Sequence, residues 1–112
     1  MEFARHREMM EEHRNYLDRQ FKTRTDGLYI VRDAYWTRGY YGGNPPDGEI
    51  YRLRNEFVDD AGRRHWRVMT EGRCHEGIDR QQRAFDAMVS NALEIFPQLT
   101  DKQIRSLPVR FS

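Results

Sequence analysis

Apolar and polar residues alternate along residues 49–71, on both sides of a turn sequence at 59–62. One alternate set is mainly apolar and comprises Tyr51, Leu53, Asn55, Phe57, Trp66, Val68 and Thr70. The other set is mainly charged and comprises Arg52, Arg54, Glu56, His65, Arg67, Met69 and Glu71. Because successive side chains of a β-strand point to opposite faces, the pattern predicts an antiparallel hairpin. Its apolar set should face the core, and its charged set should form a surface dominated by arginine.

The turn sequence also predicts how the two strands of the hairpin pair. A four-residue loop at 59–62 pairs Val58 with Arg63 and keeps each apolar residue opposite an apolar or small one. The same pairing places Arg54 opposite Arg67. Two like charges in this position repel each other unless an anion or a carboxylate lies between them.

Two further segments precede the hairpin. Phe3, Met10 and Leu17 recur every seven residues, which predicts an amphipathic helix over residues 2–21. Both alternate sets of residues 28–37 are largely apolar, which is typical of a strand that is central or covered on both faces.

Capping boxes mark the starts of two helices after the hairpin. Asp79 with Gln82 predicts a helix that runs to about residue 96, where a proline follows. Thr100 with Gln103 predicts a short helix that ends near residue 106. Residues 107–112 are expected to form an extended tail.

The expected order of elements is therefore α-β-β-β-α-α within a single domain, residues 1–112. This order predicts an α+β fold of two layers, in which a three-stranded antiparallel sheet packs on the N- and C-terminal helices. The arginine-rich face of the hairpin would then be the open face of the sheet.

Composition narrows the classes of function. A chain of 112 residues can bury one core without disulfides or metal. Its net charge of +1 provides no overall field toward nucleic acid or membrane. The single cysteine, Cys74, excludes an internal disulfide and fits a reducing compartment. Since neither a signal peptide nor an apolar run of ~20 residues is present, we expect a soluble, cytoplasmic protein that does not act at a membrane.

The charged set of the hairpin provides the first candidate site. Arg52, Arg54 and Arg67 are expected to share the open face with Arg32 and His65, beside the tyrosines of the preceding strand. Arginine with aromatic side chains suits phosphate pairing and base stacking, and equally suits contact with protein carboxylates. The competing interpretation is an ordinary surface of neutralised charge, which contributes little. The carboxylates that would neutralise this face are Asp33, Glu56 and Glu71.

The second candidate is the glycine- and proline-rich loop at 38–48, which carries Tyr40 and Tyr41. Long loops in compact domains are often functional, and tyrosines recur as anchors of protein interfaces. The competing interpretation is a mobile connection whose tyrosines fold back on the edge of the sheet.

Catalytic and cofactor motifs are not found. The glycines at 39–43 match neither the P-loop nor the dinucleotide-binding pattern. Cys74 and His75 are adjacent, so their side chains diverge and form no nucleophile–base pair. His6 and His13 are two helical turns apart, too far to share a metal ion. We therefore expect a protein that is not an enzyme and has no cofactor or metal site.

These observations favour a small intracellular protein that acts by protein–protein interaction, as an adaptor or inhibitor of the kind that phages and mobile elements encode. Its binding residues would be Tyr40, Tyr41, Arg52, Arg54, Arg67, Arg32 and His65. The alternative is nucleic-acid binding by the same arginine/tyrosine face. A homodimer is a further expectation, because residues 2–21 and 28–37 both have more apolar surface than one contact requires.

Overall fold

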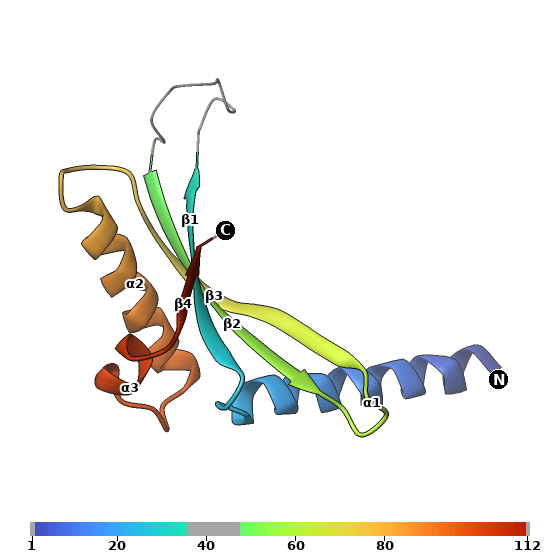
Figure 1. Cartoon of the computed structure of the whole chain (residues 1–112). Coiled ribbons are helices and arrows are strands. Elements are labelled where there is room, and N and C mark those ends of the chain that lie inside the picture. The colour runs from blue at the N-terminus through green and yellow to red at the C-terminus, as the bar shows by residue number, and fades with distance from the viewer. Residues whose placement is uncertain (1, 36–47, 112) are drawn as a thin grey trace.

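The computed structural model describes residues 2–35 and 48–111, so the predicted binding loop with Tyr40 and Tyr41 lies outside the described residues. The order of elements confirms the predicted α+β class (Figure 1). These elements are α1 (Glu2–Thr23), β1 (Leu28–Tyr35), β2 (Gly48–Val58), β3 (Arg64–Cys74), α2 (Arg80–Ile95), α3 (Asp101–Arg105) and β4 (Val109–Phe111).

The described strands form one mixed, four-stranded sheet in the order β3-β2-β1-β4. β1–β2 and β2–β3 are antiparallel, but β4 runs parallel to β1, where the amide of Ile30 donates to the carbonyl oxygen of Pro108 at 2.8 Å. The prediction of a three-stranded antiparallel sheet was therefore wrong in detail. A three-residue strand directly after a proline is too short to show an alternating pattern in the sequence.

The predicted hairpin pairing was also wrong. Val58 pairs with Arg64, so the loop has five residues, and the Asp59 carboxylate holds it by accepting the amides of Ala61 and Arg63. A β-bulge then shifts the pairing in the middle of the hairpin. Such a bulge adds one residue to one strand. The extra residue is Met69, because Arg54 pairs with Val68 whereas Leu53 pairs with Thr70.

The bulge exchanges the two faces of β3 over its first half. Residues that pair directly across an antiparallel ladder point to the same face. His65 and Arg67, which pair with Phe57 and Asn55, therefore lie on the face that the helices cover. Trp66 and Val68, predicted to be in the core, lie on the opposite face with Arg54 and Glu56. The predicted opposition of Arg54 and Arg67 does not occur.

The main core lies between α2 and the half of the sheet nearest to it (Figure 1). At Gly72 the backbones of β3 and α2 come very close, because a Cβ there would lie 2.2 Å from the Ala84 carbonyl oxygen and 2.3 Å from the Met88 amide nitrogen. Only glycine fits this approach. The buried members of this core are Leu28, Ile30, Tyr51, Leu53, Ala84, Met88, Val89, Ala92, Phe96 and Ile104.

The C-terminal end of α1 covers the other half of the same face, at the hairpin end of the sheet (Figure 1). Phe21 packs edge to face on Phe57 at 5.0 Å between ring centroids. The buried side chain of Asn55 donates to the carbonyl oxygens of Phe21 and Arg24 at 2.8 and 2.7 Å, so β2 caps the C-terminus of α1.

The two predicted capping boxes have different outcomes. Thr100 and Gln103 form the predicted reciprocal box at the start of α3. Asp79 is the residue before α2, as predicted, but its side chain makes no capping hydrogen bond. Asp79 has a bent rather than an extended backbone, with φ −97° and ψ 16°, and an N-cap side chain usually reaches the helix amides from an extended conformation.

α1 projects beyond the rest of the fold as an arm (Figure 1). The radius of gyration is 17.4 Å, whereas a compact chain of this length has about 13 Å. Every residue from 3 to 15 is exposed. The first half of this helix is thus largely uncovered by the other described residues.

Candidate binding surface

The sheet face turned away from α2 carries two of the five arginine and histidine residues predicted to lie on the open face, Arg52 and Arg54. Arg32 pairs with Tyr51, so it points to the helix-covered face, as do His65 and Arg67. The pattern of alternation assigned these three residues wrongly. For His65 and Arg67 the physical reason is the bulge, and for Arg32 it is the pairing of β1 with β2, which the sequence did not specify.

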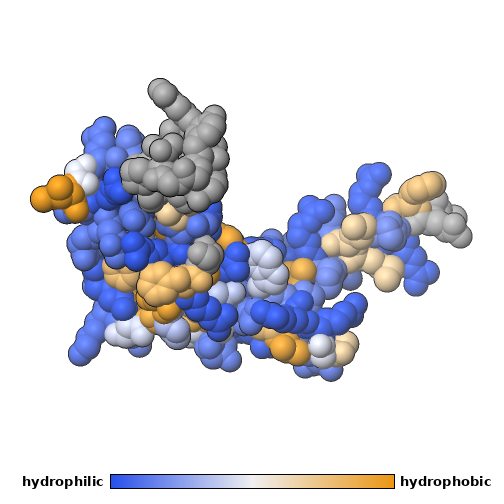
Figure 2. Space-filling model, turned by 45° about the horizontal axis from the view of Figure 1, so that its top comes forward, coloured by the Kyte–Doolittle hydropathy of each residue, from blue (hydrophilic) through white to orange (hydrophobic). Residues whose placement is uncertain are grey.

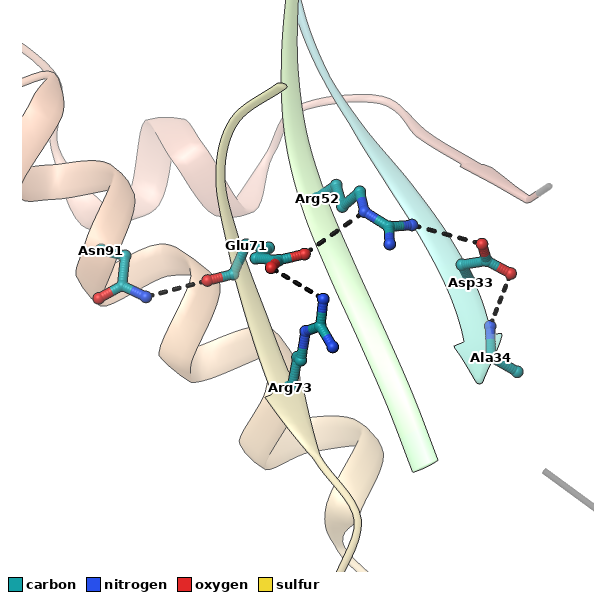
Figure 3. A network of polar contacts seen from close by, with 6 residues as sticks. All are labelled: Asp33, Ala34, Arg52, Glu71, Arg73 and Asn91. Atoms are coloured by element: carbon teal, nitrogen blue, oxygen red, sulfur yellow. Dashed lines mark hydrogen bonds and ion pairs between the residues drawn. The ribbon is translucent and has the colours of Figure 1, made fainter. Parts of the chain in front are cut away.

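Arg52 is neutralised within the sheet. Its guanidinium lies between Asp33 of β1 and Glu71 of β3, at 3.4 Å from each carboxylate, and Glu71 also contacts Arg73 at 3.0 Å (Figure 3). A further pair on this face joins Glu56 and Arg64. The expected neutralisation by Asp33, Glu56 and Glu71 is therefore observed, and partly exposed pairs of this kind contribute little to stability.

Arg67 and His65 both bind neighbouring residues of the same chain. Arg67 contacts Asp18 of α1 at 2.6 Å and lies over the ring of Phe21 at 4.6 Å, and this hydrogen bond lowers the pKa of Asp18. His65 stacks on Phe57 at 5.1 Å. Its Nε2 lies 2.8 Å from Asp59, and this contact, with the loop amides, lowers the pKa of that carboxyl.

Arg32 is likewise held within the fold. Its Nε and Nη2 each donate to one oxygen of the Glu49 carboxylate at 3.2 Å, which raises the pKa of the guanidinium. The same guanidinium lies over Phe111 of β4 at 5.5 Å. Arg32 thus ties the short edge strand to the rest of the sheet, since a bidentate arginine–carboxylate pair fixes geometry as well as charge.

Arg54 differs from the other predicted arginines. Its guanidinium lies over the ring of Trp66 at 4.5 Å, and it makes no ion pair with a carboxylate of the described residues. Among residues 2–35 and 48–111, its buried Nε has no hydrogen-bond partner. Buried polar atoms are nearly always hydrogen-bonded, so this side chain keeps unused donor capacity.

Arg110 and Tyr29 extend this arrangement toward β4. The guanidinium of Arg110 lies over Tyr29 at 4.2 Å, and Tyr29 pairs across the strands with Arg54. Arg110, Tyr29, Arg54 and Trp66 therefore form one row of alternating cations and aromatic rings, which we name the arginine–aromatic row. It crosses all four described strands.

The apolar surface beside the arginine–aromatic row is exposed. Trp66 is 53% exposed, and its neighbours Val58 and Val68 are exposed on the same face. Sequence reasoning assigned Trp66 to the core and did not consider Arg110. The apolar alternate set of the hairpin contains the polar residue Asn55. This residue was a sign in the sequence that the set does not form a simple core face.

Within residues 2–35 and 48–111, no group of three histidine, cysteine, aspartate or glutamate side chains is placed to hold a metal ion. No helix in this part of the chain has the length and apolar character needed to cross a membrane. Cys74 is half-buried and donates to the Glu76 carbonyl oxygen at 3.4 Å.

Comparison with known proteins finds no significant match: no family model, no curated protein and no solved structure is similar to this chain. Function is therefore inferred from the geometry of the surface.

Proposed function

We propose that this chain is a protein-binding module, of the adaptor or inhibitor type, whose interface is centred on Trp66 and Arg54. The observation that carries the proposal is a half-exposed tryptophan stacked under a guanidinium that has no carboxylate partner among the described residues. Tryptophan and arginine are the residue types most enriched among the dominant residues of protein interfaces. Val58 and Val68 supply the apolar surroundings that such a centre needs to exclude water.

The charges on this face favour a partner segment that carries a carboxylate beside apolar side chains. Arg52 and Arg64 already have carboxylate partners within the chain, whereas Arg54 and Arg110 have none among the described residues. A partner carboxylate can accept two parallel hydrogen bonds from a guanidinium. The contribution of Tyr40 and Tyr41 stays a prediction, tested by replacing both with alanine in the binding assay below.

Affinity purification of the full chain from its native cell, with and without nuclease, tests the proposal. Trp66→Ala and Arg54→Gln should each abolish retention of the partner protein and leave the melting temperature within a few degrees of the wild type. Ile78→Ala is the matched control, because Ile78 is a fully exposed apolar residue outside this face. The proposal requires a nuclease-resistant partner that the control retains. Equal retention by Trp66→Ala, or no partner in any arm, would overturn it.

Binding of single-stranded nucleic acid is the second candidate, favoured by the arginine–aromatic row. Arg54 and Arg110 can contact phosphates, and Trp66, the exposed ring of the row, provides a stacking surface for a base. If this candidate holds, a fluorescent oligonucleotide should bind with an affinity that falls steeply with salt. Arg54→Gln and Arg110→Gln should each reduce that salt dependence. No binding at low salt would exclude nucleic acid.

A further inference from the structure

The first half of α1 carries apolar side chains that the other described parts of the chain leave exposed. Phe3, Met9 and Met10 are 86%, 61% and 53% exposed. In Figure 2 apolar side chains lie among polar ones along the arm at the right, where Figure 1 places α1. A helical segment of this length without tertiary contacts is only marginally stable in water. A partner that packs on this segment would therefore stabilise it.

The spacing of these residues identifies the partner as another helix. Phe3, Met10 and Leu17 are seven residues apart, and a repeat of seven keeps one seam facing a neighbouring helix. At its C-terminal end this seam continues into Phe21, which packs on Phe57 of the hairpin. The hairpin thus closes the seam at one end, where the ring of His13 also lies edge to face with that of His65 at 6.4 Å between centroids. The other described residues leave the seam uncovered over residues 3–12.

We infer that the occupant of this seam is a second copy of the chain, bound antiparallel through residues 3–12 of each α1. Residues 3–15 are neutral apart from their histidines, with arginines at 5, 7 and 14 and glutamates at 8, 11 and 12, so their charge favours neither an acidic nor a basic partner. An antiparallel pair can place Phe3 of each copy opposite Met10 of the other. A parallel pair would place each histidine against itself.

The area available fits a reversible dimer. Three large side chains from each copy bury on the order of 800 Å² together, by comparison with roughly 150–250 Å² for one buried aromatic residue. The histidines and the aliphatic parts of the arginines bring the total near the lower limit of specific interfaces, about 1,200 Å². The dimer should therefore form at micromolar concentration and dissociate on dilution.

Sedimentation velocity of the full chain between about 1 μM and about 300 μM tests this inference. The wild type should change from monomer to dimer across that range, and Met10→Glu should remain a monomer at every concentration. Asn15→Glu is the matched control, because five residues turn a helix by about 140° and place this position away from the seam. The control should dimerise like the wild type.

Two results would overturn the inference: a wild type that stays monomeric at the highest concentration, or a control that dissociates as completely as Met10→Glu. Circular dichroism establishes that each variant keeps its fold. Trp66→Ala should leave dimerisation unchanged, since it lies on the sheet and not on the seam. Failure of the dimer and failure of the proposed function are therefore distinguished by separate variants.

Discussion

Replacing Asn55 by alanine should strongly weaken the attachment of α1 to the sheet. Asn55 is fully buried on β2, and its amide group donates to two carbonyl oxygens at the C-terminus of α1, those of Phe21 and Arg24. Its own Oδ1 accepts the Glu56 amide at 3.0 Å. The last carbonyl oxygens of a helix have no hydrogen-bond donor within the helix, and the Asn55 side chain supplies two of these missing donors.

The expected loss of stability follows from these contacts. Each lost hydrogen bond costs about 1 kcal/mol, and a buried acceptor left without a partner adds about 1–3 kcal/mol. Since the Asn55→Ala variant loses both donated bonds, we expect the free energy of unfolding to fall by about 2–4 kcal/mol. Domains of this size have only about 5–15 kcal/mol in total.

Urea denaturation followed by circular dichroism measures this loss. Asn91→Ala is the matched control, because Asn91 is exposed and donates only one bond, to the Glu71 carbonyl oxygen at 2.9 Å (Figure 3). The control should lose at most about 1 kcal/mol. Asn55→Asp should be at least as destabilising as alanine, since it directs a carboxylate at the negative end of a helix. A loss below about 0.5 kcal/mol for Asn55→Ala would refute the reasoning.

Two further predictions concern close packing and pH. Gly72→Ala should lower the free energy of unfolding by about 3 kcal/mol, because the new Cβ meets the backbone of α2, and the same denaturation assay measures it. Gly62→Ala in the hairpin loop should cost only about 1 kcal/mol, since the space around it is open and only its positive φ is strained; equal losses at both positions would contradict this account. Stability should also fall as pH drops below about 4, because carboxyls whose pKa is lowered in the folded state stabilise it above their ordinary pKa and lose this contribution on protonation. The carboxyls concerned are Asp18, Asp59 and Asp86, whose hydrogen-bond partners are Arg67, His65 and Arg105 respectively. Melting temperatures between pH 7 and pH 3 test this, and a flat profile would show that these pairs do not contribute.

The helices could be predicted from the sequence because their signals are local. The seven-residue repeat of α1 and the capping box of Thr100 need only neighbouring residues, and both are present as expected. The positions of Arg52 and Arg54 on the open face likewise follow from the alternation along β2. Each of these inferences depends on one segment alone.

The pairing of segments could not be predicted, because it depends on residues that are distant in sequence. A bulge at Met69 changes the direction of every preceding side chain of β3, and no residue type marks it. β4 is too short to show periodicity, so Arg110 was not recognised as part of a sheet. The same strand pairing determines which carboxylate neutralises each arginine. It therefore also determines which of the predicted arginines have no ion pair among the described residues.

The bulge at Met69 also affects how the molecule opens. One face of the sheet packs against two separate clusters, since the main core includes neither Phe21 nor Phe57, which contact each other. The bulge lies between the two halves of β3 that contribute to these clusters. Opening of the α1 contact therefore leaves the α2 core closed, and small packing centres open at lower free energy than large ones. The amides of α1 should therefore exchange with solvent by local opening, before those of β1 and α2.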